Sequence, residues 1–258
     1  QLSYHFSYKK LLRFTLPSII MMIFTSIYGV VDGFFVSNFV GKTPFAAVNF
    51  IMPFLMILGA IGFMFGTGGG ALIAITMGEG DRERARRLFS LFVYVSAACA
   101  VVIAVFGIVF LRLIASFLGA EGQMLEDCVT YGRIILIALP AYILQFEFQS
   151  FFITAEKPQL GLWVTVAAGV TNMVLDALFI AVFDWGLVGA AAATAISQAV
   201  GGIVPLFYFA GNNGSLLRLT KTRFDGHALL RACANGSSEL MSNVSMSLVG
   251  MLYNVQLM

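Results

Sequence analysis

The sequence has few charged side chains and few cysteines for its length of 258 residues. Charged residues make up 11% of it, whereas a soluble domain carries roughly 25%, so the composition excludes an ordinary water-soluble domain. The net charge of +2 is too small to indicate a nucleic-acid partner. Cys99, Cys128 and Cys233 are scattered and odd in number. They match no metal-binding spacing and predict no disulfide framework.

Sequence motifs of soluble catalysis are also missing. The chain contains no Gly-x-Ser-x-Gly, no His-Glu-x-x-His and no nucleotide-binding P-loop. Its glycine-rich stretch, residues 62–70, is not followed by the Lys-Ser/Thr pair that a phosphate-binding loop needs. The four-residue spacing of Gly62, Gly66 and Gly70 predicts close helix packing instead. We therefore expect a protein that is not an enzyme and has no cofactor.

What the sequence does contain is long apolar runs. Hydrophobic residues make up 59% of the chain, and stretches of about 20 apolar residues are long enough to span a membrane as helices. The expected fold is an all-α membrane protein, with a six-helix lobe at 1–210, a cytoplasmic linker at 211–236 and a first helix of a second lobe at 237–258. Within the lobe we expect helices at about 11–37, 47–76, 88–114, 127–153, 160–182 and 187–210.

A short repeat supports the idea of a second lobe. Leu11-Leu12-Arg13 leads into the first apolar helix, and Leu229-Leu230-Arg231 leads into the seventh. Transporters are often built from parallel repeats of this kind. Because the chain ends inside the seventh helix, we expect it to be the first half of something larger.

Lysine and arginine are divided unevenly between the two predicted sides of the membrane. If the N-terminus is cytoplasmic, the inner segments hold twelve of the 15 basic residues, and the outer side holds only Lys42, Arg112 and Arg133. An excess of basic residues is typical of cytoplasmic loops. The sequence therefore predicts a multi-pass protein of the cell (inner) membrane with a cytoplasmic N-terminus, whose linker lies as an amphipathic segment on the inner surface.

Two carboxylates, an amide and a hydroxyl are predicted to lie at one level in the outer half of the helices. An ionisable side chain inside a membrane segment is costly and is usually functional. At about 1.5 Å per residue, Asp32, Asp176 and Thr194 lie roughly 8, 9 and 10 Å from the outer ends of their helices. Asn172 precedes Asp176 by four residues and so shares its helix face.

The chemistry of this set favours a small cation. Carboxylate, amide and hydroxyl oxygens suit hard cations. Two carboxylates close together in a low dielectric do not both stay charged alone, so either a cation neutralises them or one keeps a proton. The set therefore predicts a Na⁺ or H⁺ site of an ion-coupled transporter, with Asp32, Asn172, Asp176 and Thr194 as the metal ligands if the ion is Na⁺. The alternative is that these groups only form hydrogen bonds between helices.

Two further residues in the predicted helices need an explanation. Pro17 removes a backbone hydrogen bond early in the helix that carries Asp32, so we expect a kink there, either as a moving part or as a static bend. Glu147 lies nearer the inner end of its helix. We expect it to pair with a cytoplasmic arginine or to reach the membrane interface.

Several short motifs, in their order and spacing, resemble those of the multidrug and toxic compound extrusion (MATE) transporters. The resemblance covers essentially the whole chain. The motifs are Leu16-Pro17, Val31-Asp32-Gly33-Phe34-Phe35-Val36, Gly78-Glu79-Gly80-Asp81, Thr154-Ala155-Glu156-Lys157-Pro158, Asn172-Met173-Val174-Leu175-Asp176 and Gly186-Leu187-Val188-Gly189-Ala190-Ala191.

The resemblance implies a twelve-helix protein of two six-helix lobes around a central cleft, of which this chain holds the first lobe. It implies antiport of small organic, often cationic, drugs against Na⁺ or H⁺ by alternating access, with the second lobe as partner and the four oxygen-bearing residues as cation ligands. The mobile proline of the family matches Pro17. Its pocket-lining positions fall at Tyr131 and Gln149, although Gln149 replaces an Asn-type position.

Two alternatives stay open beside this interpretation. The first is a lipid-linked oligosaccharide flippase of the same superfamily, which would be expected to have a cationic cleft. Nearly all basic residues of this chain are predicted to be cytoplasmic, which argues against such a cleft. A membrane scaffold built on half a transporter would not transport at all. We also expect that the chain alone does not transport, because alternating access needs both halves.

Overall fold

The structure, a computed structural model, describes residues 8–211 and 214–256 of the chain. Residues 1–7 of the predicted lobe, 212–213 of the predicted linker and 257–258 at the end of the predicted seventh helix lie outside the described residues. The described part is helical, with no strand in it. Its elements are α1 (Tyr8–Phe35), η1 (Val36–Val40), α2 (Lys42–Met64), η2 (Phe65–Gly69), α3 (Gly70–Gly78), α4 (Arg82–Phe117), α5 (Gly122–Thr154), α6 (Pro158–Asp176), η3 (Ala177–Val182), α7 (Gly186–Ala210) and α8 (Gly226–Gln256).

Six helical stretches of the described residues are long and apolar enough to cross a membrane. Each of the six helices expected for the lobe corresponds to one of them, which confirms the all-α membrane class. Three stretches continue into a short π-helix, in which the backbone hydrogen bond closes a wider turn. They are 15–40, 42–78, 82–117, 122–154, 158–182 and 186–210.

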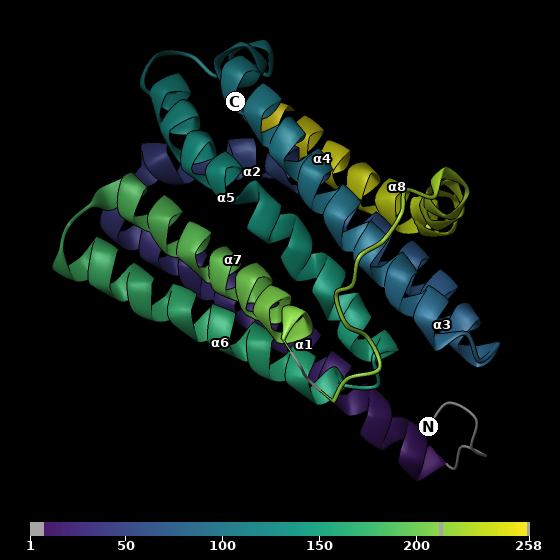
Figure 1. Ribbon diagram of the computed structural model, residues 1–258. Coiled ribbons are helices and arrows are strands. Elements are labelled where there is room, and N and C mark those ends of the chain that lie inside the picture. The colour runs from purple at the N-terminus through teal and green to yellow at the C-terminus, as the bar shows by residue number, and fades with distance from the viewer. Residues whose placement is uncertain (1–7, 212–213, 257–258) are drawn as a thin grey trace.

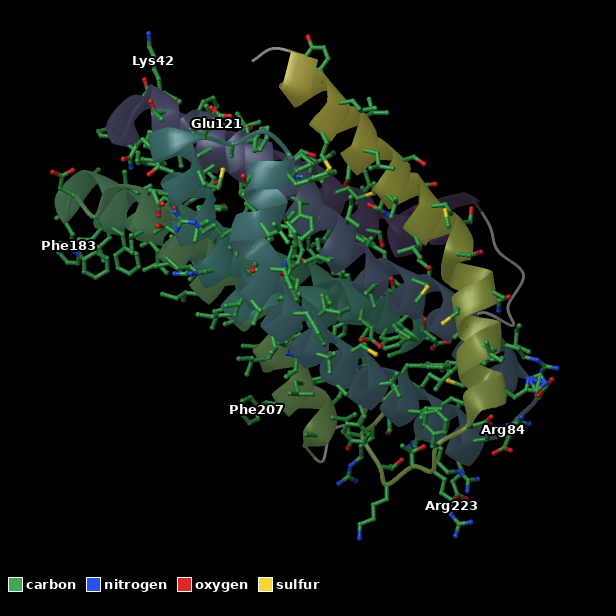
Figure 2. All side chains as sticks on the ribbon, turned by 90° about the horizontal axis from the view of Figure 1, so that it is seen from above. Lys42, Arg84, Glu121, Phe183, Phe207 and Arg223 are labelled. Atoms are coloured by element: carbon green, nitrogen blue, oxygen red, sulfur yellow. The ribbon has the colours of Figure 1, made fainter. Side chains whose placement is uncertain are left out.

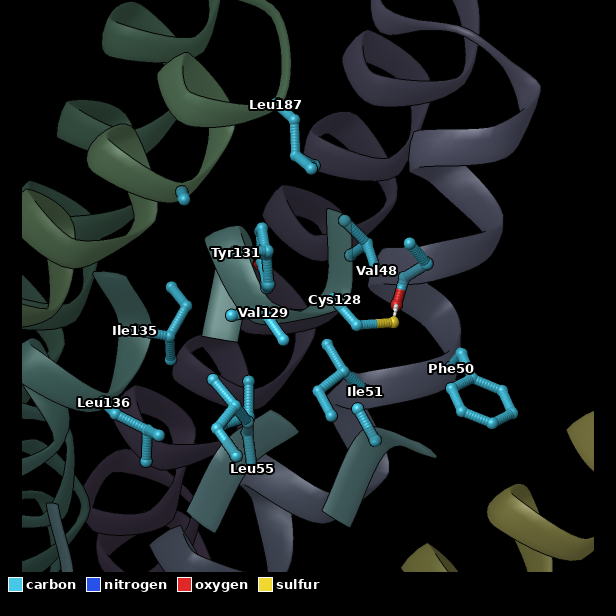
Figure 3. Close-up of a cluster of buried hydrophobic side chains, with 14 of the residues drawn as sticks. Val48, Phe50, Ile51, Leu55, Cys128, Val129, Tyr131, Ile135, Leu136 and Leu187 are labelled. Carbon is cyan, nitrogen blue, oxygen red and sulfur yellow. Dashed lines mark hydrogen bonds between the residues drawn. The ribbon is translucent and has the colours of Figure 1, made fainter. Parts of the chain in front are cut away.

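The central helix of the bundle is α5. It packs against α2, α4 and α7, and Figure 1 shows it running between α4 on one side and α6 and α7 on the other. The first half of α5 lies in an apolar cluster that includes Ile51, Leu55 and Tyr131 (Figure 3). In the same cluster the Cys128 thiol contacts the Ala47 carbonyl oxygen at 3.5 Å. The other half of α5 packs in a cluster rich in phenylalanine.

A row of glycines in the second membrane stretch lets α5 approach closely. A Cβ atom added to Gly62 would overlap the backbone of Ile143 in α5. One added to Gly66 would lie 2.9 Å from the Ser150 hydroxyl oxygen, and one added to Gly70 would lie 3.0 Å from the Thr154 hydroxyl oxygen. The prediction that this row serves helix packing is therefore confirmed.

The end of this row also receives α8. Gly66 lies inside η2 and Gly70 directly follows it. Between these two glycines, Gly68 faces the backbone of Ala232 in α8 and Gly69 faces the ring of Phe92 in α4. The stretch therefore touches three helices over five residues, and a side chain larger than hydrogen would separate them.

The last helix differs from the expected one in where it begins and in its character. It begins at Gly226 rather than at about 237, because the Asp225 carboxylate accepts hydrogen bonds from the backbone N–H groups of His227 and Ala228, both at 3.1 Å. An aspartate in this position stabilises a helix start, and hydropathy does not register it. Among the described residues α8 is also not one of the stretches apolar enough to be a membrane span, because serines and asparagines interrupt its apolar face.

The segment 214–225, which we call the strap, is extended and fastened to α4. The Ser90 hydroxyl accepts a 2.8 Å hydrogen bond from the Thr220 backbone N–H, and the Thr222 hydroxyl donates to the Arg87 carbonyl oxygen at 2.9 Å. The side chain of Leu217 is fully buried. The strap is therefore held in the fold, and residues 226–236 of the expected linker belong to α8.

Candidate functional site

The candidate site lies where α1 packs along α6. Phe24 and Tyr28 of α1 face Gly169 of α6, where an added Cβ would lie 3.0 Å from the Tyr28 ring. One turn beyond Tyr28, on the same face of α1, comes Asp32; on α6, Asp176 follows Gly169 by two turns. The two helices therefore carry their carboxylates toward each other, and the side chains of Asp32 and Asp176 lie within interaction distance.

Most oxygen atoms of these side chains are buried and have no hydrogen-bond donor. Asp176 is fully buried and Asn172 is 2% exposed. Five buried oxygens have no hydrogen-bond partner in the described part of the chain. They are Asp32 Oδ1, Asn172 Oδ1, Asp176 Oδ1, Asp176 Oδ2 and Thr194 Oγ1.

Two further helices complete this part of the bundle. Thr194 lies on α7, and Tyr131 on α5 is 1% exposed. The Tyr131 hydroxyl lies within interaction distance of Asp32, Asp176 and Thr194, and it contacts the Met52 sulfur at 3.8 Å. The structure therefore brings Tyr131, expected only as a pocket-lining residue, to the carboxylate pair.

Both carboxylates lie next to π-helical turns. Asp176 is the last residue of α6 and η3 follows it directly, while η1 begins four residues after Asp32. The two π-helices pack against each other. Such turns are rare and are frequent at functional sites. Apolar periodicity carries no signal for such turns, so the sequence does not predict them.

The arrangement fits a small hard cation or a proton. In the described part of the chain neither Asp32 nor Asp176 forms an ion pair with a basic side chain. Buried carboxylates without a counter-charge are strongly disfavoured, so a cation between them or a proton on one of them is needed. Carboxylate, amide and hydroxyl oxygens together are ligands for hard cations. The described residues include no group of three or more His, Cys, Asp or Glu side chains that could hold a metal ion.

Two predicted functional residues lie away from the carboxylate pair. Gln149 follows Tyr131 by 18 residues on α5, which corresponds to about 27 Å along the helix. Its amide lies 3.5 Å from the Thr165 hydroxyl oxygen beside a cavity of about 10 Å³, which is about the minimum for one water molecule. Pro17 lies inside α1, and the helix continues through it.

The expectation for Glu147 is wrong. Its side chain is fully buried in α5, and one carboxyl oxygen accepts a hydrogen bond from the Ser96 hydroxyl of α4. The other oxygen has no partner among the described residues, so no arginine pairs with it. The misplacement arose because depth along one helix does not reveal which side the helix turns to its neighbours.

Comparison with known proteins gives this arrangement a context. The sequence model of the MatE family matches residues 17–178. Multidrug export protein MepA of Staphylococcus haemolyticus is 30% identical over 209 residues, which are 81% of this chain and 46% of that protein. The chain thus spans about half the length of such relatives.

Two solved structures of similar fold represent different conformations. One is described as the inward-facing conformation of a multidrug resistance MATE family transporter, and it aligns with a TM-score of 0.83 at 23% identity, covering 89% of this chain and 52% of that one. The other is described as outward-facing, and it aligns with a TM-score of 0.85 at 24% identity, covering 92% and 53%. At these identities the likeness shows a common fold.

Proposed function

The chain belongs to the MatE family, and we propose that it forms the first lobe of a cation-coupled exporter of small organic compounds. The observation that carries the proposal is the set of five buried oxygens without donors around Asp32 and Asp176. A purely structural role would satisfy these atoms with hydrogen bonds, because buried polar groups are almost always paired. Atoms left in this state are suited to an ion that comes and goes.

In this proposal Asp32 and Asp176 bind Na⁺ or H⁺, and Asn172 and Thr194 complete the set of oxygen ligands. The Tyr131 hydroxyl borders the same site, where it contacts the Met52 sulfur at 3.8 Å, so the oxygens of both carboxylates stay available to the ion. A bound cation favours the conformation in which α1 and α6 hold the two carboxylates together. Loss of the cation leaves two like charges in a low dielectric, which drives the helices apart.

Helix α1 is the element best placed to respond. It packs mainly against α6, and it exposes large apolar side chains such as Met22 and Val30 on its other faces. Few contacts therefore have to break when α1 moves, and Pro17 removes a backbone hydrogen bond that would stiffen it. Similar folds are described in inward-facing and outward-facing conformations, which supports alternating access.

The remaining parts of the proposal concern the partner and the membrane. A second six-helix lobe would cover the faces of α1 and α2 that this chain leaves open, and α8 would join the two lobes. The protein would lie in the cell membrane with its N-terminus in the cytoplasm. Basic residues support this orientation, since Arg84 and Arg223 lie at one end of the molecule and Lys42 at the other (Figure 2).

The test is drug resistance in cells that express this chain together with its second lobe. We expect Asp32→Asn to abolish resistance and ion-dependent efflux while the protein stays in the membrane at wild-type abundance. A matched control is Asp184→Asn, since Asp184 is exposed outside the site and its backbone has a positive φ of 55° that asparagine tolerates. Full resistance in the Asp32→Asn variant would contradict the proposal.

A further inference from the structure

A basic groove lies at the end of the bundle opposite Lys42, between the start of α4, the strap and the start of α8. Its volume is about 780 Å³. Four basic side chains line it, namely Arg84 and Arg87 from α4 and Lys221 and Arg223 from the strap. Figure 2 shows Arg84 and Arg223 on the same corner of the molecule. Segments more than 130 residues apart in sequence therefore bring four cations to one groove.

The charge of the groove is not neutralised within the described part of the chain. None of the four basic side chains forms an ion pair there. The single acidic residue lining the groove is Asp225, and one of its carboxylate oxygens caps α8. Like charges gathered around one groove repel each other, so the groove favours an anion that sits between them.

The groove is also held in shape by hydrogen bonds. The Arg86 guanidinium Nε donates to the Leu216 carbonyl oxygen at 3.1 Å. The Thr220 N–H, which donates to Ser90, and the Thr222 hydroxyl, which donates to the Arg87 carbonyl, fix the strap on either side of Lys221. Basic residues that only set membrane orientation need to be on the correct side, and they need no fixed geometry. Hydrogen bonds that hold the strap against α4 are therefore not explained by a role in membrane orientation alone.

The lining of the groove is apolar as well as basic. Leu88 and Leu91 form part of it and are buried, while Phe224 at its edge is 80% exposed. The groove also lies at the first turns of α4, which begins a membrane stretch at Arg82. Cations beside apolar side chains at a membrane boundary suit a molecule with a phosphate at one end and hydrocarbon at the other.

We propose that this groove binds the headgroup of an anionic phospholipid, with the phosphate between the α4 arginines and the strap cations and the first acyl carbons over the exposed ring of Phe224. The bound lipid would hold the strap against α4 next to the start of α8. A free phosphate ion would use the same cations, but it would leave the apolar part of the lining unused.

The experiment is native mass spectrometry of the purified 258-residue chain in detergent, titrated with phosphatidylglycerol or with phosphatidylcholine of identical acyl chains. Each Lys or Arg near an anionic surface contributes about a fivefold change in affinity. We therefore expect Lys221→Gln to weaken phosphatidylglycerol binding about fivefold, and Lys221→Gln with Arg223→Gln to weaken it about thirtyfold. Both side chains are exposed, so these variants keep the fold, which circular dichroism checks.

The control is Lys157→Gln, which removes one exposed charge outside the groove and should leave binding unchanged. Equal binding of the two lipids by the wild-type chain would overturn the proposal. So would an equal effect of Lys157→Gln and Lys221→Gln, because general surface charge would then explain the binding. Inorganic phosphate that binds as tightly as phosphatidylglycerol would also overturn it and would assign the groove to a free anion.

Discussion

Replacing Gly62 by alanine should destabilise the fold, although alanine is the better helix former. Gly62 in α2 faces the backbone of Ile143 in α5, and an added Cβ would lie 3.1 Å from the Ile143 Cα. Carbon atoms pack best at about 3.5–4.0 Å. Since backbone cannot rotate away as a side chain can, α2 and α5 would have to separate by roughly 0.5–1 Å.

The expected cost follows from this separation. A gap of about 0.5–1 Å forfeits a quarter to a half of the dispersion energy of each contact across the interface, and added methyl groups in packed cores typically cost about 1–3 kcal/mol. Gly29 in α1 provides the matched control, because an added Cβ there meets nothing within 4 Å. Gly29→Ala should instead stabilise the helix by about 0.5–1 kcal/mol, so the two variants should differ by about 1.5–4 kcal/mol.

The assay is reversible unfolding of the purified chain in mixed micelles of increasing sodium dodecyl sulfate content, followed by circular dichroism. The midpoint for Gly62→Ala should fall below that of the wild type, and the midpoint for Gly29→Ala should match or exceed it. Equal midpoints for the two variants would contradict this prediction, because the close approach of α2 and α5 would then contribute nothing measurable to stability.

Two further predictions concern buried and capping polar groups. Ser96→Ala should lower the free energy of unfolding by about 1–3 kcal/mol, because it leaves the buried Glu147 carboxyl without its donor. Glu147→Gln keeps an acceptor for Ser96 and should therefore cost less in the same assay. A larger loss of stability for Glu147→Gln than for Ser96→Ala would contradict this prediction. Asp225→Ala should lower the free energy of unfolding by about 1 kcal/mol, because it removes the cap of α8. Amide hydrogen exchange in the first turn of α8 should become faster. Unchanged exchange there would show that Asp225 does not stabilise the helix start.

The membrane helices could be predicted because each depends on its own composition. A run of about 20 apolar residues is enough for a span, and the stretch ending at Ala210 was expected and found with the same end. Helix starts were less accurate. The stretch expected from 88 begins at Arg82, because the Asp81 side chain caps it at 2.9 Å from the Arg84 backbone nitrogen and its first turn is charged rather than apolar.

The candidate site was partly predictable for a similar reason. Asp32, Asp176 and Thr194 could be assigned a common depth by counting residues along three helices. The interhelical geometry could not be obtained by counting. The π-helical turns beside both carboxylates, the approach of Tyr131 and the burial of Glu147 all depend on how helices rotate against one another, and single-helix patterns do not determine that rotation.

The most direct test of the cation site is infrared difference spectroscopy of the purified chain as the buffer is exchanged from potassium to sodium and as pH is stepped. We predict a carboxyl signal that responds to Na⁺ or to pH, that Asp32→Asn and Asp176→Asn each remove, and that Asp184→Asn leaves unchanged. A spectrum in which neither Asp32→Asn nor Asp176→Asn alters any ion-dependent or pH-dependent carboxyl band would contradict the account.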